Sequence, residues 1–171
     1  LLQEVTEPWI EAVREIDGYS LALSSPRIDN FGLAILHRDG DSEGDQDGGQ
    51  DEDSDGQRLR IELGDPWIEE VELGTTTLPM AVQPLTVDDK KVAILSVHTL
   101  PPAGGRMARN RNEQLQWVAD WAVRTRETGV RPVVVGDLNI TPFSPHFRRL
   151  LRSGELENSQ RGFGYHATWG A

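Results

Sequence analysis

The most chemically informative stretch of this sequence is a predicted strand that ends on an aspartate and an asparagine. The β-branched, apolar run Val133 to Val135 predicts a strand buried on both faces. It continues into Gly136-Asp137-Leu138-Asn139, and Asp137 and Asn139 project to the same side because side chains alternate along an extended chain. A carboxylate and a carboxamide held together at the end of a rigid strand are suited to binding a metal-bound phosphate and a water molecule.

The Gly-Asp-x-Asn motif also has an ordinary structural interpretation. Asp and Asn are common in turns because they tolerate unusual backbone angles, and Thr141-Pro142 ends the extended pattern shortly afterwards. A short motif of this kind leaves both interpretations open. Two other predicted strands favour the chemical interpretation, because each of them also ends on a residue that can contact a metal ion or a phosphate.

These two strands carry a glutamate and a histidine. Leu1-Leu2-Gln3 reads as the tail of a buried strand and is followed by Glu4. Lys91 to Val97 is a second apolar strand and is followed by His98. A single histidine at a strand end is more often structural, but three strands that end in the same way favour a shared site.

A helix is predicted after each of the three strands. Thr6 is placed to cap the first helix, in which apolar residues recur at helical spacing up to Gly18: Ile10, Val13 and Ile16. The second helix is predicted over 106–127, and the third over 145–154 with Ser144 as its cap. Further strands are predicted at 31–36, 58–63, 67–73 and 80–87, the last forming a hairpin with 91–97.

In this order, the segments resemble the endonuclease/exonuclease/phosphatase superfamily, which includes DNase I-like nucleases and inositol-phosphate phosphatases. The C-terminal segment is similar to a bacterial branch of it. The resemblance spans nearly the whole chain and rests on these segments: Leu2-Gln3-Glu4-Val5, Phe31 to Leu36, Val97 to Pro102, Arg111-x-x-Gln114-Leu115, Gly136-Asp137-Leu138-Asn139 with Thr141-Pro142, and Arg161 to Trp169.

The alternation of strands and helices predicts an α/β protein, and the resemblance implies a four-layer α/β/β/α sandwich of two mixed sheets. Residues 1–171 are expected to form a single domain. Family members also have a strand with a metal-site asparagine before the Leu-Gln-Glu segment and a later strand with an Asp-His pair. Neither is present between Leu1 and Ala171, so the resemblance implies a domain truncated at both ends.

The resemblance implies a role for each candidate site residue. Glu4 would bind Mg²⁺ or Mn²⁺, and Asp137 would orient or activate the attacking water. Asn139 would hydrogen-bond a phosphoryl oxygen, and His98 would donate to a phosphate oxygen or protonate the leaving group. Arg111 is a candidate phosphate contact, with an exposed arginine on a helix surface as the alternative.

Several other residues of the same types are assigned to structure rather than to chemistry. They are His37, His146 and His166, which have no comparable setting, and Trp117 and Trp121, which are one helical turn apart and are expected to pack in the core.

The function implied is a divalent-metal-dependent hydrolase of phosphate esters, first a phosphodiesterase or nuclease and second a phosphatase of small or lipid phosphates. A different class of function is a catalytically inactive binding module that self-associates through exposed sheet edges. Two arginine clusters could follow a nucleic-acid backbone, and both could equally be solvated helix surfaces: Arg106, Arg109 and Arg111, and Arg148, Arg149 and Arg152.

The net charge of −11 is concentrated in one segment. Residues 39–57 hold nine of the 28 acidic side chains, which leaves 19 acidic against 17 basic side chains elsewhere. This Gly-, Gln- and Ser-rich segment is expected to be a disordered loop. It contains a match to a calcium-binding loop (Asp51, Asp53, Asp55, Gly56 and Glu62), which we attribute to chance because no amphipathic helix precedes it.

Composition sets the remaining limits. The sequence has no cysteine, which excludes disulfides and thiolate metal sites. No apolar run is long enough to span a bilayer, so we expect a soluble domain without membrane contact of its own. A bacterial cytoplasmic protein and a soluble part of a membrane-anchored parent both fit, and the location remains unassigned.

Overall fold

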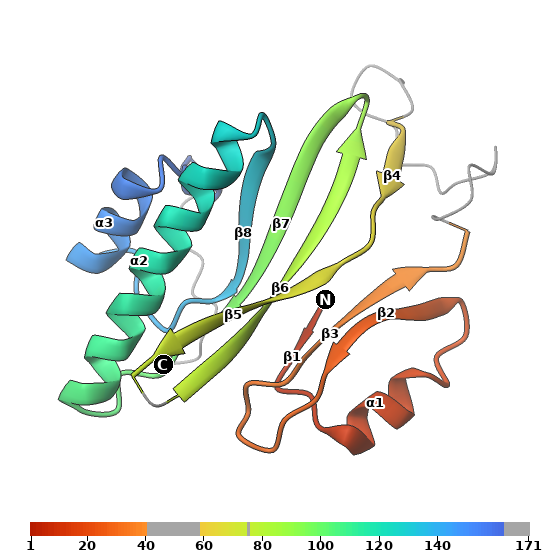
Figure 1. The fold of residues 1–171 in the computed structure, drawn as a ribbon, viewed down its shortest axis with the longest axis horizontal. Helices are drawn as coiled ribbons and strands as arrows, with labels where there is room; N and C mark the ends of the chain where they lie inside the picture. The colour runs from red at the N-terminus through yellow and green to blue at the C-terminus, as the bar shows by residue number, and fades with distance from the viewer. Residues whose placement is uncertain (41–58, 75, 163–171) are drawn as a thin grey trace.

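The computed structural model describes residues 1–40, 59–74 and 76–162, which form two β-sheets and three helices (Figure 1). The smaller sheet contains β1 (Leu2–Gln3), β3 (Leu33–Arg38) and β2 (Tyr19–Ser25), in that spatial order. All of its strand pairs are antiparallel. None of the helices in these residues is long and apolar enough to cross a membrane.

Helix α1 (Glu7–Val13) covers the outer face of the smaller sheet. Its buried side chains Ile10 and Val13 pack against Val5 and Ala34. Thr6 is the N-cap residue, as predicted, although its side chain makes no capping hydrogen bond. The predicted extension to Gly18 is wrong, because α1 ends at Val13 and Ile16 is 45% exposed, with no core opposite it.

The larger sheet contains β4 (Ile61–Leu63), β5 (Trp67–Leu73), β6 (Thr76–Val87), β7 (Lys90–His98) and β8 (Arg131–Asp137). Its strand order is β4-β6-β7-β8. β4 pairs with the last residues of the long strand β6, and β5 pairs with the earlier part of β6. Asp88 and Asp89, both with positive φ, form the tight turn of the β6–β7 hairpin. Strands β7 and β8 are parallel, so this sheet is mixed.

Helices α2 (Gly105–Glu127) and α3 (Pro145–Ser153) cover the outer face of the larger sheet (Figure 1). The main core lies between these helices and the larger sheet, and it includes Leu95, Val97 and Val118, all with no exposed surface. Trp121 is buried and Trp117 packs against the same core, which confirms their structural role. The Ser144 side chain accepts a hydrogen bond from the His146 amide at 3.2 Å and caps α3 as predicted.

The inner faces of the two sheets contact each other through a small apolar cluster centred on Leu33, Ile35 and Ala81. Two polar side chains also bridge the sheets. His37 Nε2 donates to Gln83 Oε1 at 2.7 Å, and Gln3 Nε2 donates to the Val97 carbonyl at 2.8 Å. The layers are therefore α1, the smaller sheet, the larger sheet, and α2 with α3, which confirms the expected α/β/β/α sandwich.

Strand β8 differs from its prediction. Within the described residues it pairs only with β7, and Val133 and Val135 are each 36% exposed. Val134 packs toward α2, so the two exposed valines lie on the opposite face of the strand. Three consecutive β-branched residues are typical of a strand covered on both sides, but in the described residues one side of β8 is open.

The acidic segment lies almost entirely outside the described residues. Only Asp39 and Gly40 of the predicted loop are described, and Asp39 accepts a hydrogen bond from the Ser20 hydroxyl. The aspartates of the calcium-loop match also lie outside. Its last residue, Glu62, belongs to β4 and forms an ion pair with Arg60 at 3.4 Å.

We predict that Gly32→Ala destabilises the protein by about 1–3 kcal/mol or more, because the added methyl would overlap backbone atoms. A Cβ at this position would lie 1.9 Å from the Val5 carbonyl oxygen and 2.7 Å from the Arg27 amide nitrogen. Those two atoms are hydrogen-bonded at 3.0 Å and join the loop before β3 to the chain after β1. Urea unfolding measures the change.

Gly105→Ala is the matched control, since the nearest atom to its added Cβ is Arg109 Nη1 at 3.6 Å. That substitution should leave stability unchanged or raise it slightly. Equal unfolding free energies for the two variants would show that the close contact at Gly32 does not exist in solution.

Candidate functional site

The predicted site residues come together where β1, β7 and β8 finish, at one end of the sandwich. Glu4 Oε1 lies 3.7 Å from His98 Nε2, although Glu4 follows a strand of the smaller sheet and His98 ends a strand of the larger one. His98 and Asp137 are register partners at the ends of the parallel strands β7 and β8. The glutamate side chain is 61% exposed, so this cluster lies at an open surface.

Asn139 joins the cluster through hydrogen bonds to its neighbours. Its amide nitrogen donates to Asp137 Oδ1 at 2.7 Å, and its side-chain Nδ2 donates to the Thr99 carbonyl at 2.7 Å. The Thr99 amide in turn donates to the Asp137 carbonyl at 2.9 Å. These bonds fix the aspartate and the asparagine relative to the end of β7, one residue beyond His98.

Two of the four residues have an unusual backbone conformation. Glu4 has a φ of 61° and Asn139 a φ of 46°, in the left-handed region that costs a non-glycine residue on the order of 1 kcal/mol. Such conformations cluster at functional sites, where the surrounding structure enforces them. Here the enforcing contacts are the hydrogen bonds around Asn139 and the bridge between the sheets at Gln3, the residue before Glu4.

The imidazole of His98 is oriented by packing rather than by an acceptor. Its ring lies 5.1 Å from the Phe31 ring at an interplanar angle of 39°. His98 Nδ1 is buried and has no hydrogen-bond partner among the described residues. Because burying an N–H group without an acceptor is costly, this setting favours the tautomer with the proton on Nε2, the atom nearest Glu4.

Arg111 is buried, with 8% of its surface exposed, which contradicts the interpretation as an exposed helix arginine. Its Nη1 donates to the Asn139 carbonyl at 3.0 Å, and its Nη2 donates to Asn112 Oδ1 at 2.9 Å. Both acceptors are uncharged, and no carboxylate pairs with this guanidinium in the part of the chain that the structure describes. Arg111 therefore supports the Asn139 backbone and adds an unneutralised positive charge behind it.

Gln114, one helical turn after Arg111, holds the other loop of the site. It is fully buried, and its Oε1 accepts a hydrogen bond from the Leu100 amide at 2.8 Å. Helix α2 thus supports the chain after His98 through Gln114 and the chain after Asp137 through Arg111. The sequence contained a signal for this role, because both polar residues share the apolar helix face with Leu115 and Val118.

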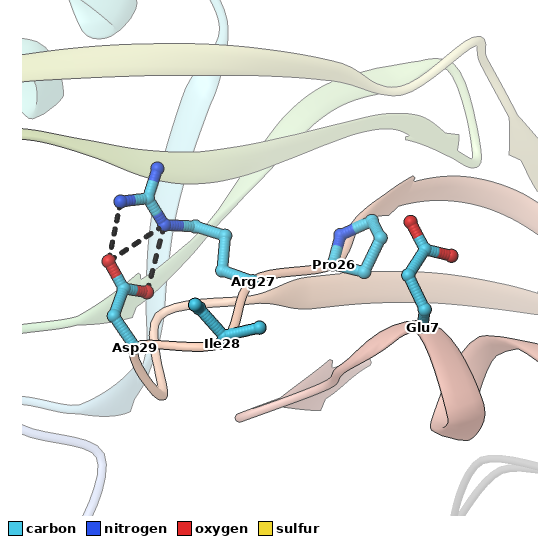
Figure 2. Close-up of a pocket in the computed structure, with 5 residues that line it drawn as sticks. All are labelled: Glu7, Pro26, Arg27, Ile28 and Asp29. Atoms are coloured by element: carbon cyan, nitrogen blue, oxygen red, sulfur yellow. Dashed lines mark hydrogen bonds and ion pairs between the residues drawn. The ribbon is translucent and has the colours of Figure 1, made fainter.

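The loop between β2 and β3 lies beside the cluster and carries the ring that packs on His98. Arg27 and Asp29 form a charged pair in this loop with an N–O distance of 2.5 Å, and Figure 2 shows them bordering a surface cavity with Glu7, Pro26 and Ile28. Hydrogen bonding to Arg27 is the main cause that lowers the pKa of Asp29 below its ordinary value. Asp29 Oδ1 also accepts the Phe31 amide at 3.2 Å.

One arginine from each of the two predicted clusters lines a groove shared by α2 and α3, whereas Arg111 of the first cluster is buried beside Asn139. Arg109 of α2 and Arg149 of α3 line one groove with His146 and Glu113, around a cavity of about 360 Å³. His146 accepts a hydrogen bond from Asn112 at 3.4 Å, in keeping with a structural role. His37 is likewise structural, as a bridge between the sheets, and His166 lies outside the described residues.

The donor atoms of the cluster fit a hard divalent cation. Glu4, Asp137 and Asn139 offer carboxylate and amide oxygens, and Mg²⁺ is usually bound through one or two carboxylates while it keeps several waters. In the described ranges, no group of three or more His, Asp or Glu side chains is arranged to enclose a metal ion. The oxygens could therefore hold a partly hydrated Mg²⁺ or Mn²⁺ rather than a fully enclosed ion.

A model of the endonuclease/exonuclease/phosphatase family matches residues 1–171. The chain therefore belongs to this family of phosphate-ester hydrolases. No curated protein matches the sequence.

Solved structures with a similar fold include two of TDP2 from D. rerio, one humanized by 14 mutations and one complexed with a single-strand DNA product. Both have a TM-score of 0.57 and 14% sequence identity; they cover 92% and 87% of this chain and 56% and 50% of their own. A truncated TDP2 from Caenorhabditis elegans has a TM-score of 0.51 and 15% identity, and covers 82% of this chain and 48% of its own. The chain thus spans about half the length of these structures.

We predict that Asp29→Asn lowers stability near neutral pH by no more than about 1 kcal/mol, because the charged pair is partly exposed. The folded-state pKa of Asp29 is lowered, so its contribution is present above the unfolded value and is lost as the pH falls through the folded value. The difference between variant and wild type should therefore shrink as the pH falls below about 4, the ordinary pKa of an aspartate.

Urea unfolding of both proteins at about pH 7 and about pH 3 measures this difference. Asp65→Asn, in the exposed turn between β4 and β5, serves as the control for removing a surface carboxylate. A stability difference at Asp29 that stays constant over this pH range would show that the charged pair is not its cause.

Proposed function

We propose that this chain, acting as one domain over residues 1–171, is a divalent-metal-dependent phosphoesterase whose preferred substrates are phosphodiesters. The observation that carries the proposal is the meeting of Glu4, His98, Asp137 and Asn139 at one end of the sandwich. Family membership supplies the reaction class, hydrolysis of a phosphate ester. The remaining steps follow from what each side chain can do there.

Asp137 is the group that orients and activates the attacking water. Its Oδ1 is committed to the Asn139 amide at 2.7 Å, which fixes the plane of the carboxylate. The second oxygen can then accept a proton from a water molecule placed in line with the phosphorus. A carboxylate held in this way loses little freedom when the substrate binds.

Asn139 and Arg111 stabilise the negative charge on the phosphoryl group. One Asn139 side-chain N–H donates to the Thr99 carbonyl, and the other is left to donate to a phosphoryl oxygen. Arg111 does not need to touch the substrate, since its guanidinium lies directly behind the Asn139 carbonyl and has only uncharged acceptors. A positive charge in this position favours an anion in the site.

His98, at the end of the neighbouring strand β7, is the second hydrogen-bond donor of the site. With its proton on Nε2, the neutral imidazole can donate a hydrogen bond to a phosphate oxygen, and as the imidazolium it can protonate the departing alkoxide and return to the neutral form. Glu4 would hold the divalent ion, Mg²⁺ or Mn²⁺. When bound, that ion supplies charge withdrawal from a nonbridging phosphate oxygen and stabilisation of the leaving oxyanion. Phe31 keeps the His98 ring in place during the reaction.

The substrate we place first is a phosphodiester of nucleic-acid type, with a small or lipid phosphate ester second. The surface arginines support this order, because Arg109 and Arg149 share a groove that could contact further backbone phosphates. One protein of similar fold, D. rerio TDP2, is described with a single-strand DNA product, and the transfer of this substrate class to the present chain is part of the proposal.

We predict that Asp137→Ala lowers Mg²⁺-dependent hydrolysis of bis-p-nitrophenyl phosphate by about 10²–10⁴-fold while the protein remains folded. The reason is that the general base is removed and the core is not touched, since Asp137 lies at the end of β8. Steady-state rates and circular dichroism measure the two effects.

Asp120→Ala is the matched control, because Asp120 is an exposed carboxylate on α2 that accepts a hydrogen bond from Gln116 of the same helix. Its rate should equal that of the wild type. Full turnover in Asp137→Ala would remove Asp137 from the mechanism. Wild-type protein that is folded but inactive with Mg²⁺ and Mn²⁺ would contradict the proposed enzyme.

The second candidate is the non-catalytic module that self-associates. One observation favours it: β8 has no partner on its outer edge in the described residues, and Val133 and Val135 are exposed beside that edge. A second copy of the chain could pair with this edge and cover the two valines. The enzyme remains the first proposal because an open edge explains none of the contacts around Asp137.

If β8 mediates self-association, Val135→Lys should shift the protein toward the monomer, since the added charge would oppose pairing of two edges. Sedimentation velocity over a wide range of protein concentrations measures the shift. A wild-type protein that stays monomeric at every concentration would contradict this candidate, whatever its catalytic activity.

A further inference from the structure

One hydrogen bond joins the two sheets directly behind the candidate site. Gln3 of β1 extends its side-chain amide to the larger sheet, where Nε2 lies 2.8 Å from the Val97 carbonyl oxygen and 3.4 Å from Ser96 Oγ. The bond connects residues 94 positions apart in the sequence. Gln3 pairs with Leu33, at the start of β3. The bridge from His37 to Gln83 lies near the other end of β3, away from the site.

Gly136 of β8 makes room for this amide. A Cβ at Gly136 would lie 2.6 Å from Gln3 Nε2 and 2.1 Å from the Val97 carbonyl oxygen, and its φ of 123° is unfavourable for other residues. Val97 and Gly136 are also register partners in the parallel pair of β7 and β8. Three strands therefore meet at one point, where the Gln3 side chain crosses from the smaller sheet to the larger one.

Each of the three residues at this point immediately precedes a residue of the site. Gln3 precedes Glu4, Val97 precedes His98, and Gly136 precedes Asp137. A shift of β1 by 1 Å against β7 would be carried directly to the Glu4 carboxylate. In the described chain, β1 contains two residues and pairs with β3 of its own sheet, and this pairing does not fix β1 relative to β7.

We propose that Gln3 is a positioning residue that sets the separation between the Glu4 carboxylate and the groups on β7 and β8. This inference rests on the proposed function, because that function makes Glu4 a ligand of the divalent ion, and this role depends on the distance from Glu4 to His98 and Asp137. Gln3 itself need not touch the substrate or the ion. Its amide fixes the relative position of two sheets that otherwise contact each other through a small apolar cluster.

The test compares two glutamine-to-methionine substitutions, because methionine keeps the side-chain volume and removes the amide donor. Gln3→Met removes the bridge at the site. Gln83→Met removes the bridge at the other end, together with the hydrogen bonds from Gln83 to the Gly64 and Pro84 carbonyls. If Gln3→Met does not fold, Gln3→Asn is tested instead, because its side chain is one methylene shorter and withdraws the amide from the Val97 carbonyl.

Binding of Mn²⁺ alone, followed by electron paramagnetic resonance, is the readout, with thermal unfolding measured in parallel. We expect Gln3→Met to weaken Mn²⁺ binding by about tenfold or more, within the range known for residues that support metal ligands. Gln83→Met should lose at least as much thermal stability and keep the Mn²⁺ affinity of the wild type. A purely structural role of Gln3 would instead make affinity follow stability in both variants.

Two results overturn the inference and differ in what they mean for the function. In the first, the wild-type protein binds Mn²⁺ and Gln3→Met binds it with the same affinity. This result shows that Gln3 does not position Glu4, and it leaves the proposed function intact. Absence of Mn²⁺ binding by folded wild-type protein removes the metal-dependent function, and the positioning role of Gln3 with it.

Discussion

The candidate site depends on keeping two separate sheets in fixed relative position at one end of the sandwich. Glu4 directly follows β1 of the smaller sheet, while His98 and Asp137 end strands of the larger one, and 3.7 Å separates Glu4 Oε1 from His98 Nε2. The apolar contact between the sheets is small, so directional hydrogen bonds have to supply part of this accuracy. An amide placed behind the site provides direction that an apolar contact cannot, because it specifies both distance and orientation.

Helix α2 contributes the second layer of support by burying polar residues where apolar ones would give more stability. Arg111 and Gln114 each replace a core contact with one hydrogen bond to a loop of the site. Burial of a guanidinium without a carboxylate partner in the described residues costs free energy, and an anion beside Asn139 would recover part of that cost. The strained backbone of Glu4 and Asn139 fits the same interpretation, in which stability is given up where the chemistry takes place.

Several local features of the fold were predictable from the sequence, whereas strand β2, the end of α1 and the features that depend on distant contacts were not. Apolar runs, prolines and caps located β7, α2 and α3 to within one or two residues, because these signals act within a few positions of the chain. The open face of Val133 and Val135 was missed, since a run of β-branched residues does not specify what covers it. Arg111 and Gln3 were misjudged or overlooked because their partners lie 28 and 94 residues away. The clustering of Glu4, His98, Asp137 and Asn139 was anticipated, because each follows or ends a strand that the sequence pattern had located.

The connection between β3 and β4 leaves and rejoins the sandwich far from the chemistry. Strand β3 begins at Leu33, beside Gln3, and runs away from the site to Arg38. On the other side of the connection, the Arg60 carbonyl accepts a hydrogen bond from the Asp88 amide, in the hairpin turn where β7 begins and at the opposite end of β7 from His98. Extra length inserted there costs little, because loop-closure entropy grows only slowly with length. A fluorophore or an immobilisation tag attached near Arg38 or Arg60, the described residues at the two ends of this connection, would therefore lie away from the candidate site.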